Sequence, residues 1–169
     1  MRFPLLLSAL LLATPAFSSD IMVQDAYARS ASPSAKTGAA FLTLMNHSTR
    51  ADRLLSASSP AAARVELHTH IDAGDGVMQM RRVEAGFPLA AHGTLTLSRG
   101  GDHVMMMGLT RPFVQGEDIT LTLTFEQAGA MTVTVPIDLE RSAPGSSHGQ
   151  SHGQNHGHSN GHNTGQGHD

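Results

Sequence analysis

Hydrophobic and polar residues alternate in short runs between residues 21 and 139, and Gly, Pro, Asn, Asp and Ser separate the runs. The alternation is clearest in TLTLTF (120–125) and MTVTVPI (131–137), where Thr alternates with Leu, Phe or Val. A period of two is typical of strands in a sheet with one face exposed to water. The pattern predicts strands at 21–29, 38–46, 51–59, 63–70, 76–83, 93–100, 102–109, 118–126 and 130–138.

These segments follow one another at short intervals, and no part of the chain shows a convincing helical period. Such spacing is typical of an antiparallel sandwich or barrel, and about 120 residues suffice for one core of this kind. We therefore predict a single all-β domain over residues 19–140 and expect it to act as a monomer.

The beginning of the chain has a different pattern, with Arg2 followed by a predominantly apolar stretch at residues 5–13. That stretch is too short to span a bilayer comfortably, and Ala16 and Ser18 provide small residues at positions −3 and −1 of a cleavage site. We interpret residues 1–18 as a signal peptide cleaved near Ser18, which predicts a periplasmic protein. The alternatives are an uncleaved anchor or a buried strand. No other segment is long and apolar enough to predict stable insertion into a membrane.

The end of the chain, residues 141–169, contains six of the eleven histidines among Gly, Gln, Ser and Asn. Nothing in this composition can form a core, so we expect a disordered tail. Its histidines are His148, His152, His156, His158, His162 and His168. Neutral imidazoles on a mobile chain suit Cu(II), and also Ni(II) or Zn(II). We predict a Cu(II)-binding tail. The alternative is a cloning tag, but other residues interrupt the histidines throughout.

Charge and composition exclude several classes of function. The formal net charge is −3 and there is no basic patch, which argues against nucleic acid as a partner. The chain has no Cys, and therefore no disulfide, no thiolate ligand and no cysteine that could carry a lipid. No Ser/His/Asp set, carboxylate pair or cofactor loop is present, so we do not expect an enzyme.

The segment VELHTHIDAGDGVMQMRRV (65–83) has two strand-like arms around a turn rich in Gly and Asp, which predicts a β-hairpin. We predict the register that places His68 opposite Met80 and His70 opposite Met78. Alternation would then put both pairs on one face of the sheet and Leu67 on the other.

A second cluster is DHVMMMGL (102–109), with three consecutive methionines two places after a histidine. In a strand His103, Met105 and Met107 share one face, whereas Met106 points to the other and is expected in the core. His103 and Met105 could then meet the histidine and methionine of the hairpin.

Two imidazoles and two thioethers favour Cu(I) over Zn, Mg, Ca or Mn, because thioether sulfur is a soft, neutral ligand. Methionine and histidine also avoid the oxidation that threatens thiols in an exported protein. A blue-copper electron carrier would need a Cys ligand, which this chain lacks. The alternative interpretation is that these methionines only fill a core.

The order H-x11-M-x22-H-x-M, formed by His68, Met80, His103 and Met105, resembles that of the periplasmic copper chaperone (PCuAC-like) family, which helps to load the dinuclear copper site of cytochrome c oxidase. The resemblance extends over VQDAYARSASPSAKTGAAFLTLMNHS, ADRLLSASSP, VELHTH, GVMQMRRV and GGDHVMMMGL. Relatives usually have one residue fewer in each of the two long intervals. They often carry Met where this chain has His70.

The resemblance implies a cupredoxin-like Greek-key sandwich that binds one Cu(I) at an exposed edge and passes it to a partner protein. It implies the core ligands His68, Met80, His103 and Met105, with cytochrome c oxidase subunit II or another copper chaperone as the acceptor. We regard His70, Met78 and Met107 as candidate accessory ligands or pocket-lining residues.

Two other classes of function compete with copper delivery. A periplasmic copper buffer or resistance protein would use the same site without a dedicated acceptor, and only the resemblance favours delivery. A purely structural, adhesion-like sandwich would not account for the clustered Met and His residues.

Overall fold

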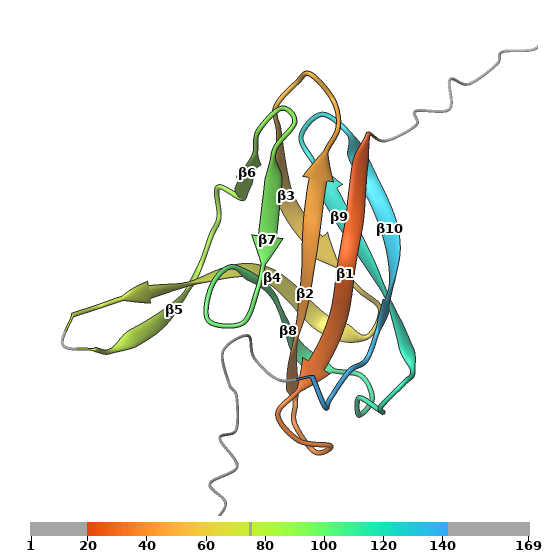
Figure 1. The fold of residues 1–169 in the computed structure, drawn as a ribbon. Coiled ribbons are helices and arrows are strands. Elements are labelled where there is room, and N and C mark those ends of the chain that lie inside the picture. Colours follow the sequence, from red (N-terminus) through yellow and green to blue (C-terminus); the bar gives the residue numbers. More distant parts are fainter. Residues whose placement is uncertain (1–19, 75, 142–169) are drawn as a thin grey trace, which may run out of the picture.

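The computed structural model describes residues 20–74 and 76–141, and every regular element in them is a β-strand. The strands form two sheets in which hydrogen-bonded neighbours are antiparallel (Figure 1). The larger sheet has the order β1 (Ile21–Ser30), β2 (Thr37–Asn46), β8 (His103–Leu109), β4 (Ala62–Asp72) and β5 (Met78–Arg82), with β7 (Thr94–Leu97) also paired to β2. The smaller sheet has the order β10 (Gly129–Pro136), β9 (Asp118–Phe125), β3 (Asp52–Ser58) and β6 (Phe87–Leu89). The predicted all-β, antiparallel fold class is confirmed.

Each of the nine predicted strands overlaps a strand of the structure, and one strand was not predicted. The missed element is β6, which has three residues and contains Pro88. A run of three residues is too short to show alternation, and Pro88 at its centre cannot donate a hydrogen bond to a sheet. β6 pairs only with β3, at the edge of the smaller sheet, where a missing donor is tolerated.

The core lies between the two sheets and follows from the alternation in the sequence. In β9 the apolar residues between the threonines are buried, as the period of two requires. Buried side chains from both sheets include Leu42, Leu44, Leu54, Leu67, Val104, Leu121, Leu123 and Val135. Met106 is 0% exposed in this core, which confirms its predicted place. Burial of a side chain of this size contributes about 1.5–3 kcal/mol.

The hairpin of β4 and β5 extends beyond the body of the sandwich, on the left of Figure 1. Its register differs from our prediction by two residues. His70, not His68, lies opposite Met80, while His68 lies opposite Arg82 and Met78 lies opposite Asp72. A shift of two residues keeps every side chain on its expected face, so the predicted faces hold while the predicted pairs do not.

The turn of this hairpin explains the shift. The amide of Ala73 donates to the carbonyl of Val77 at 2.8 Å, so the loop is centred later than we predicted. Asp72 Oδ1 accepts a hydrogen bond from the amide of Gly74 at 2.9 Å, which starts the turn immediately after β4. Gly74 and Gly76 have φ values of 95° and 74°, a region that favours glycine.

None of residues 20–74 and 76–141 belongs to a helix with the length and hydropathy of a membrane span. The predicted signal peptide and most of the predicted His-rich tail lie outside the described residues.

Candidate metal centre

The candidate ligands lie on the face of the larger sheet that points away from the core. β4 lies between β8 and β5, so it brings the two histidine-containing segments side by side. Across β4 and β8, His68 lies opposite His103 and Glu66 lies opposite Met105. The neighbours of these residues along the strands, Leu67 and Val104, point into the core.

An open pocket of about 170 Å³ lies on this face, where β2, β8 and the hairpin meet. Its lining residues are Ala39, Phe41, His70, Met80, Arg99, Gly100, His103 and Met105. The structure therefore brings together Met80, His103 and Met105, three of the four predicted core ligands, and adds His70. The fourth predicted ligand, His68, is adjacent to His103 but does not line the pocket.

One backbone carbonyl orients two of the imidazoles. Nδ1 of His103 lies 2.8 Å from the carbonyl oxygen of Gly101, and Nδ1 of His70 lies 3.3 Å from the same oxygen. A carbonyl can only accept, so each Nδ1 donates in these contacts, and in the neutral ring the lone pair is then on Nε2. The two rings lie with centroids 5.1 Å apart and an interplanar angle of 30°. This arrangement presents two imidazole nitrogens for coordination.

The environment of His103 favours the neutral form of its ring. The residue is only 2% exposed, and desolvation lowers the pKa of its imidazole, with neighbouring His70 and His68 acting in the same direction. The hydrogen bond to Gly101 and the charge of Asp102 oppose this effect. A histidine must be neutral to bind a metal, so burial prepares His103 for that role.

His68 is held in a separate network. Its Nε2 lies 2.9 Å from Oε2 of Glu66, and this hydrogen bond is the main reason why the pKa of Glu66 is lowered. Arg64 and Arg82 each lie 3.6 Å from the other oxygen of the same carboxylate. Nδ1 of His68 is buried and has no hydrogen-bond partner among the described residues.

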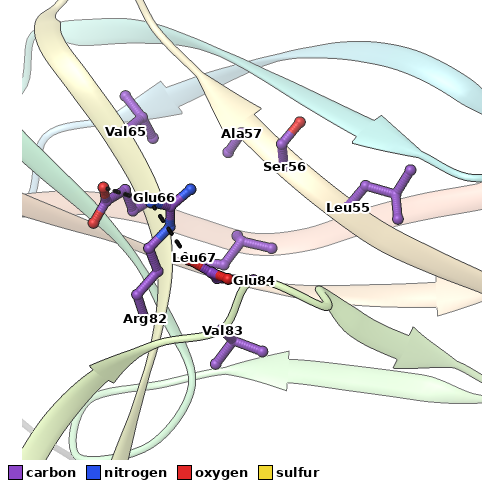
Figure 2. Close-up of a pocket in the computed structure, with 9 residues that line it drawn as sticks. All are labelled: Leu55, Ser56, Ala57, Val65, Glu66, Leu67, Arg82, Val83 and Glu84. Carbon is purple, nitrogen blue, oxygen red and sulfur yellow. Dashed lines mark ion pairs between the residues drawn. The ribbon is translucent and has the colours of Figure 1, made fainter.

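Figure 2 shows Glu66 and Arg82 of this network, at a smaller cavity of about 60 Å³ lined by residues of β3, of β4 and of the end of the hairpin. Glu66 and Arg82 point toward one another there, and Arg82 also lies 4.0 Å from Glu84. Leu55 and Ala57 of β3 form the opposite wall, so the ion pairs stand where the hairpin leaves the sandwich.

The remaining predicted residues are not gathered at the pocket. Met78 is 55% exposed near the turn of the hairpin, and Met107 has its sulfur 3.4 Å from Nη2 of Arg64; neither lines the pocket. The accessory roles of Met78 and Met107 at the site stay predictions. The predicted tail ligands all lie outside the described residues. They are His148, His152, His156, His158, His162 and His168.

Sequence reasoning missed the residues that shape and support the site. Arg99, Phe41 and Ala39 line the pocket, and the carbonyl of Gly101 orients its imidazoles. The only signal in the sequence was the pair Gly100–Gly101 before DHVMMMGL. Within residues 20–74 and 76–141, no three His, Cys, Asp or Glu side chains form a metal-binding group. A metal in this pocket would therefore depend on the thioethers as well as the imidazoles.

A family model described as "LpqE-like: Putative lipoprotein LpqE-like" matches residues 21–137, and this chain belongs to that family. A relative from Leifsonia xyli subsp. xyli, named "Putative lipoprotein Lxx21020", is 34% identical over 99 residues. The match covers 59% of this chain and 59% of that protein, so only part of the relative is represented.

Solved structures also resemble the chain. Apo-DR1885 from Deinococcus radiodurans is 30% identical with a TM-score of 0.57, and the match covers 85% of this chain and 95% of that one. The structure described as CuI-DR1885 is 32% identical with a TM-score of 0.55, covering 72% and 78%. A copper-bound PCuAC domain from PmoF2 has the same fold, with 21% identity, a TM-score of 0.60 and coverage of 76% and 99%. These matches confirm the resemblance inferred from the motif.

Proposed function

We propose that this protein is an exported copper chaperone that binds one Cu(I) in the pocket between β8 and the β4–β5 hairpin and passes it to an acceptor protein. The observation that carries the proposal is that Met80 of β5 lines one open pocket together with His103 and Met105 of β8. Membership of the family and the likeness to a protein whose structure is described as CuI-DR1885 support the proposal.

The chemistry of the pocket suits a transferable Cu(I) ion. Thioether and neutral imidazole are ligands that Cu(I) accepts, and a site without thiolate releases copper more readily than a site with it. Met80 is 47% exposed on a hairpin that extends from the sandwich, so an acceptor can reach this side of the ion. Transfer can proceed by exchange of ligands, with copper staying Cu(I) throughout.

We propose cytochrome c oxidase subunit II, or another copper chaperone, as the acceptor. The exposed thioether of Met80 supports delivery, because an acceptor protein can contact this ligand directly while copper is still bound. The alternative, a copper buffer or resistance protein without a dedicated acceptor, uses the same pocket.

We also propose that the tail histidines bind Cu(II) and supply the pocket. Support comes from Arg141, where the described part of the chain ends. Its carbonyl oxygen accepts hydrogen bonds from Nη1 of Arg29 at 2.7 Å and from Nη1 of Arg99 at 3.3 Å, and Arg99 also lines the pocket. Arg141, from which the tail continues, is thus hydrogen-bonded to a residue that lines the pocket. A tail tethered there would raise the local concentration of any copper that it holds near the pocket. Entry into the pocket requires one electron from an external reductant, because Cu(II) must become Cu(I).

The test of the core site is the double variant Met80→Leu/Met105→Leu. Leu keeps most of the volume of Met, so the fold should survive at a cost of less than about 1.5 kcal/mol per site. Cu(I) affinity is measured by competition with a chelator in the presence of reductant. It should fall by well over tenfold, because two ligands are lost and even the loss of a group that supports a ligand costs about tenfold or more. The control is Met78→Leu/Met107→Leu, which makes the same change outside the pocket. Equal affinities in the two double variants would reject the proposal.

A further inference from the structure

We infer that His70, and not His68, is the second imidazole ligand of the pocket, which gives the ligand set His70, Met80, His103 and Met105. This inference rests on the proposed function and goes beyond it, because it assigns copper to a residue that the H-x11-M-x22-H-x-M pattern does not include.

The register of the hairpin is the first reason. His70 lies directly opposite Met80, and both line the pocket together with His103 and Met105. Side chains directly opposite one another across antiparallel strands have Cβ atoms about 4.5–5.5 Å apart, close enough to share one ion. His68 lies two residue pairs further from the hairpin's turn, opposite Arg82, and does not line the pocket.

The orientation of the rings is the second reason. The shared contact with the Gly101 carbonyl leaves Nε2 free on both His70 and His103, and their centroids are 5.1 Å apart. Two imidazoles fixed through Nδ1 by one backbone oxygen form a pair that needs no change of tautomer to bind metal. A hydrogen bond of this kind is the usual way in which proteins orient a metal-binding histidine.

The partners of His68 are the third reason. Nε2 of His68 is engaged with Glu66, whose side chain is only 12% exposed, and binding copper through Nε2 would break the shortest contact of that carboxylate. Coordination by His68 would therefore use Nδ1, which is buried, and His68 does not line the pocket. We infer that His68 acts as the partner of Glu66 at the base of the hairpin. The unpartnered Nδ1 of His68 is the observation that favours His68 as the ligand instead.

The experiment compares His70→Gln with His68→Gln in the full mature chain, with His47→Gln as the control. Gln keeps a polar side chain of similar size but offers no imidazole nitrogen. Cu(I) affinity is measured by competition with a Cu(I) chelator under reductant, and the tail is identical in all variants. His70→Gln should weaken binding by at least about tenfold, and His68→Gln should weaken it by less than about threefold.

A spectroscopic measurement covers the case in which a variant fails to fold. In the wild-type protein, long-range proton–nitrogen spectra should show that Cu(I) shifts Nε2 of His70 and of His103. A shift at a nitrogen of His68 with none at His70 would overturn the inference, as would an affinity loss in His68→Gln equal to that in His70→Gln. Either result leaves copper in the pocket. By contrast, unchanged affinity in both histidine variants and in Met80→Leu/Met105→Leu would reject the proposed function itself.

Discussion

At the scale of single residues, His103 combines a buried ring with one backbone acceptor, the carbonyl of Gly101. The cost of burying a charged ring explains both its lowered pKa and its readiness to bind metal without first losing a proton. The same lowered pKa makes the stability of the metal-free protein depend on pH.

The pKa of His103 is lower in the folded protein than its usual value of about 6.5, so the unfolded chain binds this proton more readily. Its contribution to stability is complete above that pH and is lost as pH falls toward the folded pKa. We predict that the free energy of unfolding of the metal-free protein, from urea titrations, decreases between about pH 7.5 and pH 5. His103→Gln should reduce this slope. Glu66, whose pKa is also lowered, affects stability only in a more acidic range. An identical slope in the variant would contradict the assignment.

The three consecutive methionines should respond differently to truncation. Met106 is fully buried, so Met106→Ala should lower the free energy of unfolding by about 2–5 kcal/mol. Met107 lies on the outer face beside Arg64, so Met107→Ala should cost clearly less. Chemical denaturation of the two variants measures the difference. Equal losses would mean that the alternation through β8 does not hold.

At the scale of elements, the segment between β5 and β6 connects the projecting hairpin to the smaller sheet. Gly86, in this segment, has a φ of 70°, and a Cβ placed there would overlap the carbonyl oxygen of Leu54 in β3. The close approach lets Phe87 pair with Leu54 at the edge of the smaller sheet.

Replacing Gly86 by Ala should therefore combine strain and a backbone clash. The matched control is Gly129→Ala, because Gly129 has a φ of 74° but open space where a Cβ would be. We expect Gly129→Ala to cost about 1–2 kcal/mol from the positive φ alone, and Gly86→Ala to cost more. Thermal or urea unfolding compares them. If Gly86→Ala lowered the free energy of unfolding by less than Gly129→Ala, the backbone of β3 at Leu54 would have to move aside at little cost, which contradicts the prediction.

At the scale of the whole molecule, two parts of the chain that are far apart in sequence meet near the pocket. Arg141 pairs with Asp25 and lies over the ring of Tyr27 at 4.2 Å, and Tyr27 in turn packs against Phe41, which lines the pocket. The tail therefore begins at a point that several side chains hold in place.

Deleting residues 142–169 keeps Arg141 and its contacts but removes the tail histidines. We expect this truncation to abolish most Cu(II) binding in the absence of reductant, while the domain still binds about one Cu(I). Loading of the pocket from dilute Cu(II) plus reductant should become slower, because local capture is lost. Calorimetric titration and stopped-flow loading measure these effects. Full Cu(II) capacity in the truncated protein would leave the tail without the proposed role.

The sequence by itself was sufficient for the strands and for the faces of their side chains. Alternation is a local property, and the burial of Leu121 and Leu123 between exposed or half-buried threonines follows from it directly. The same is true of Met106 in the core and of the chemistry of the pocket, since His103 and Met105 had to share one face. The pattern did not predict β6, because a strand of three residues is too short for its alternation to be detected.

Only the tertiary structure decided which side chains meet. The register of β4 with β5 depends on where the turn closes, and the hydrogen bond from Ala73 to Val77 places that point later than the pattern of Gly and Asp indicated. Moving the pairing by two residues left every face unchanged, so the alternation could not reveal the error. The observed register nevertheless places His70, rather than His68, opposite Met80. Contacts between distant segments, such as Gly101 with His70, depend on how the strands pack, and no local pattern encodes them.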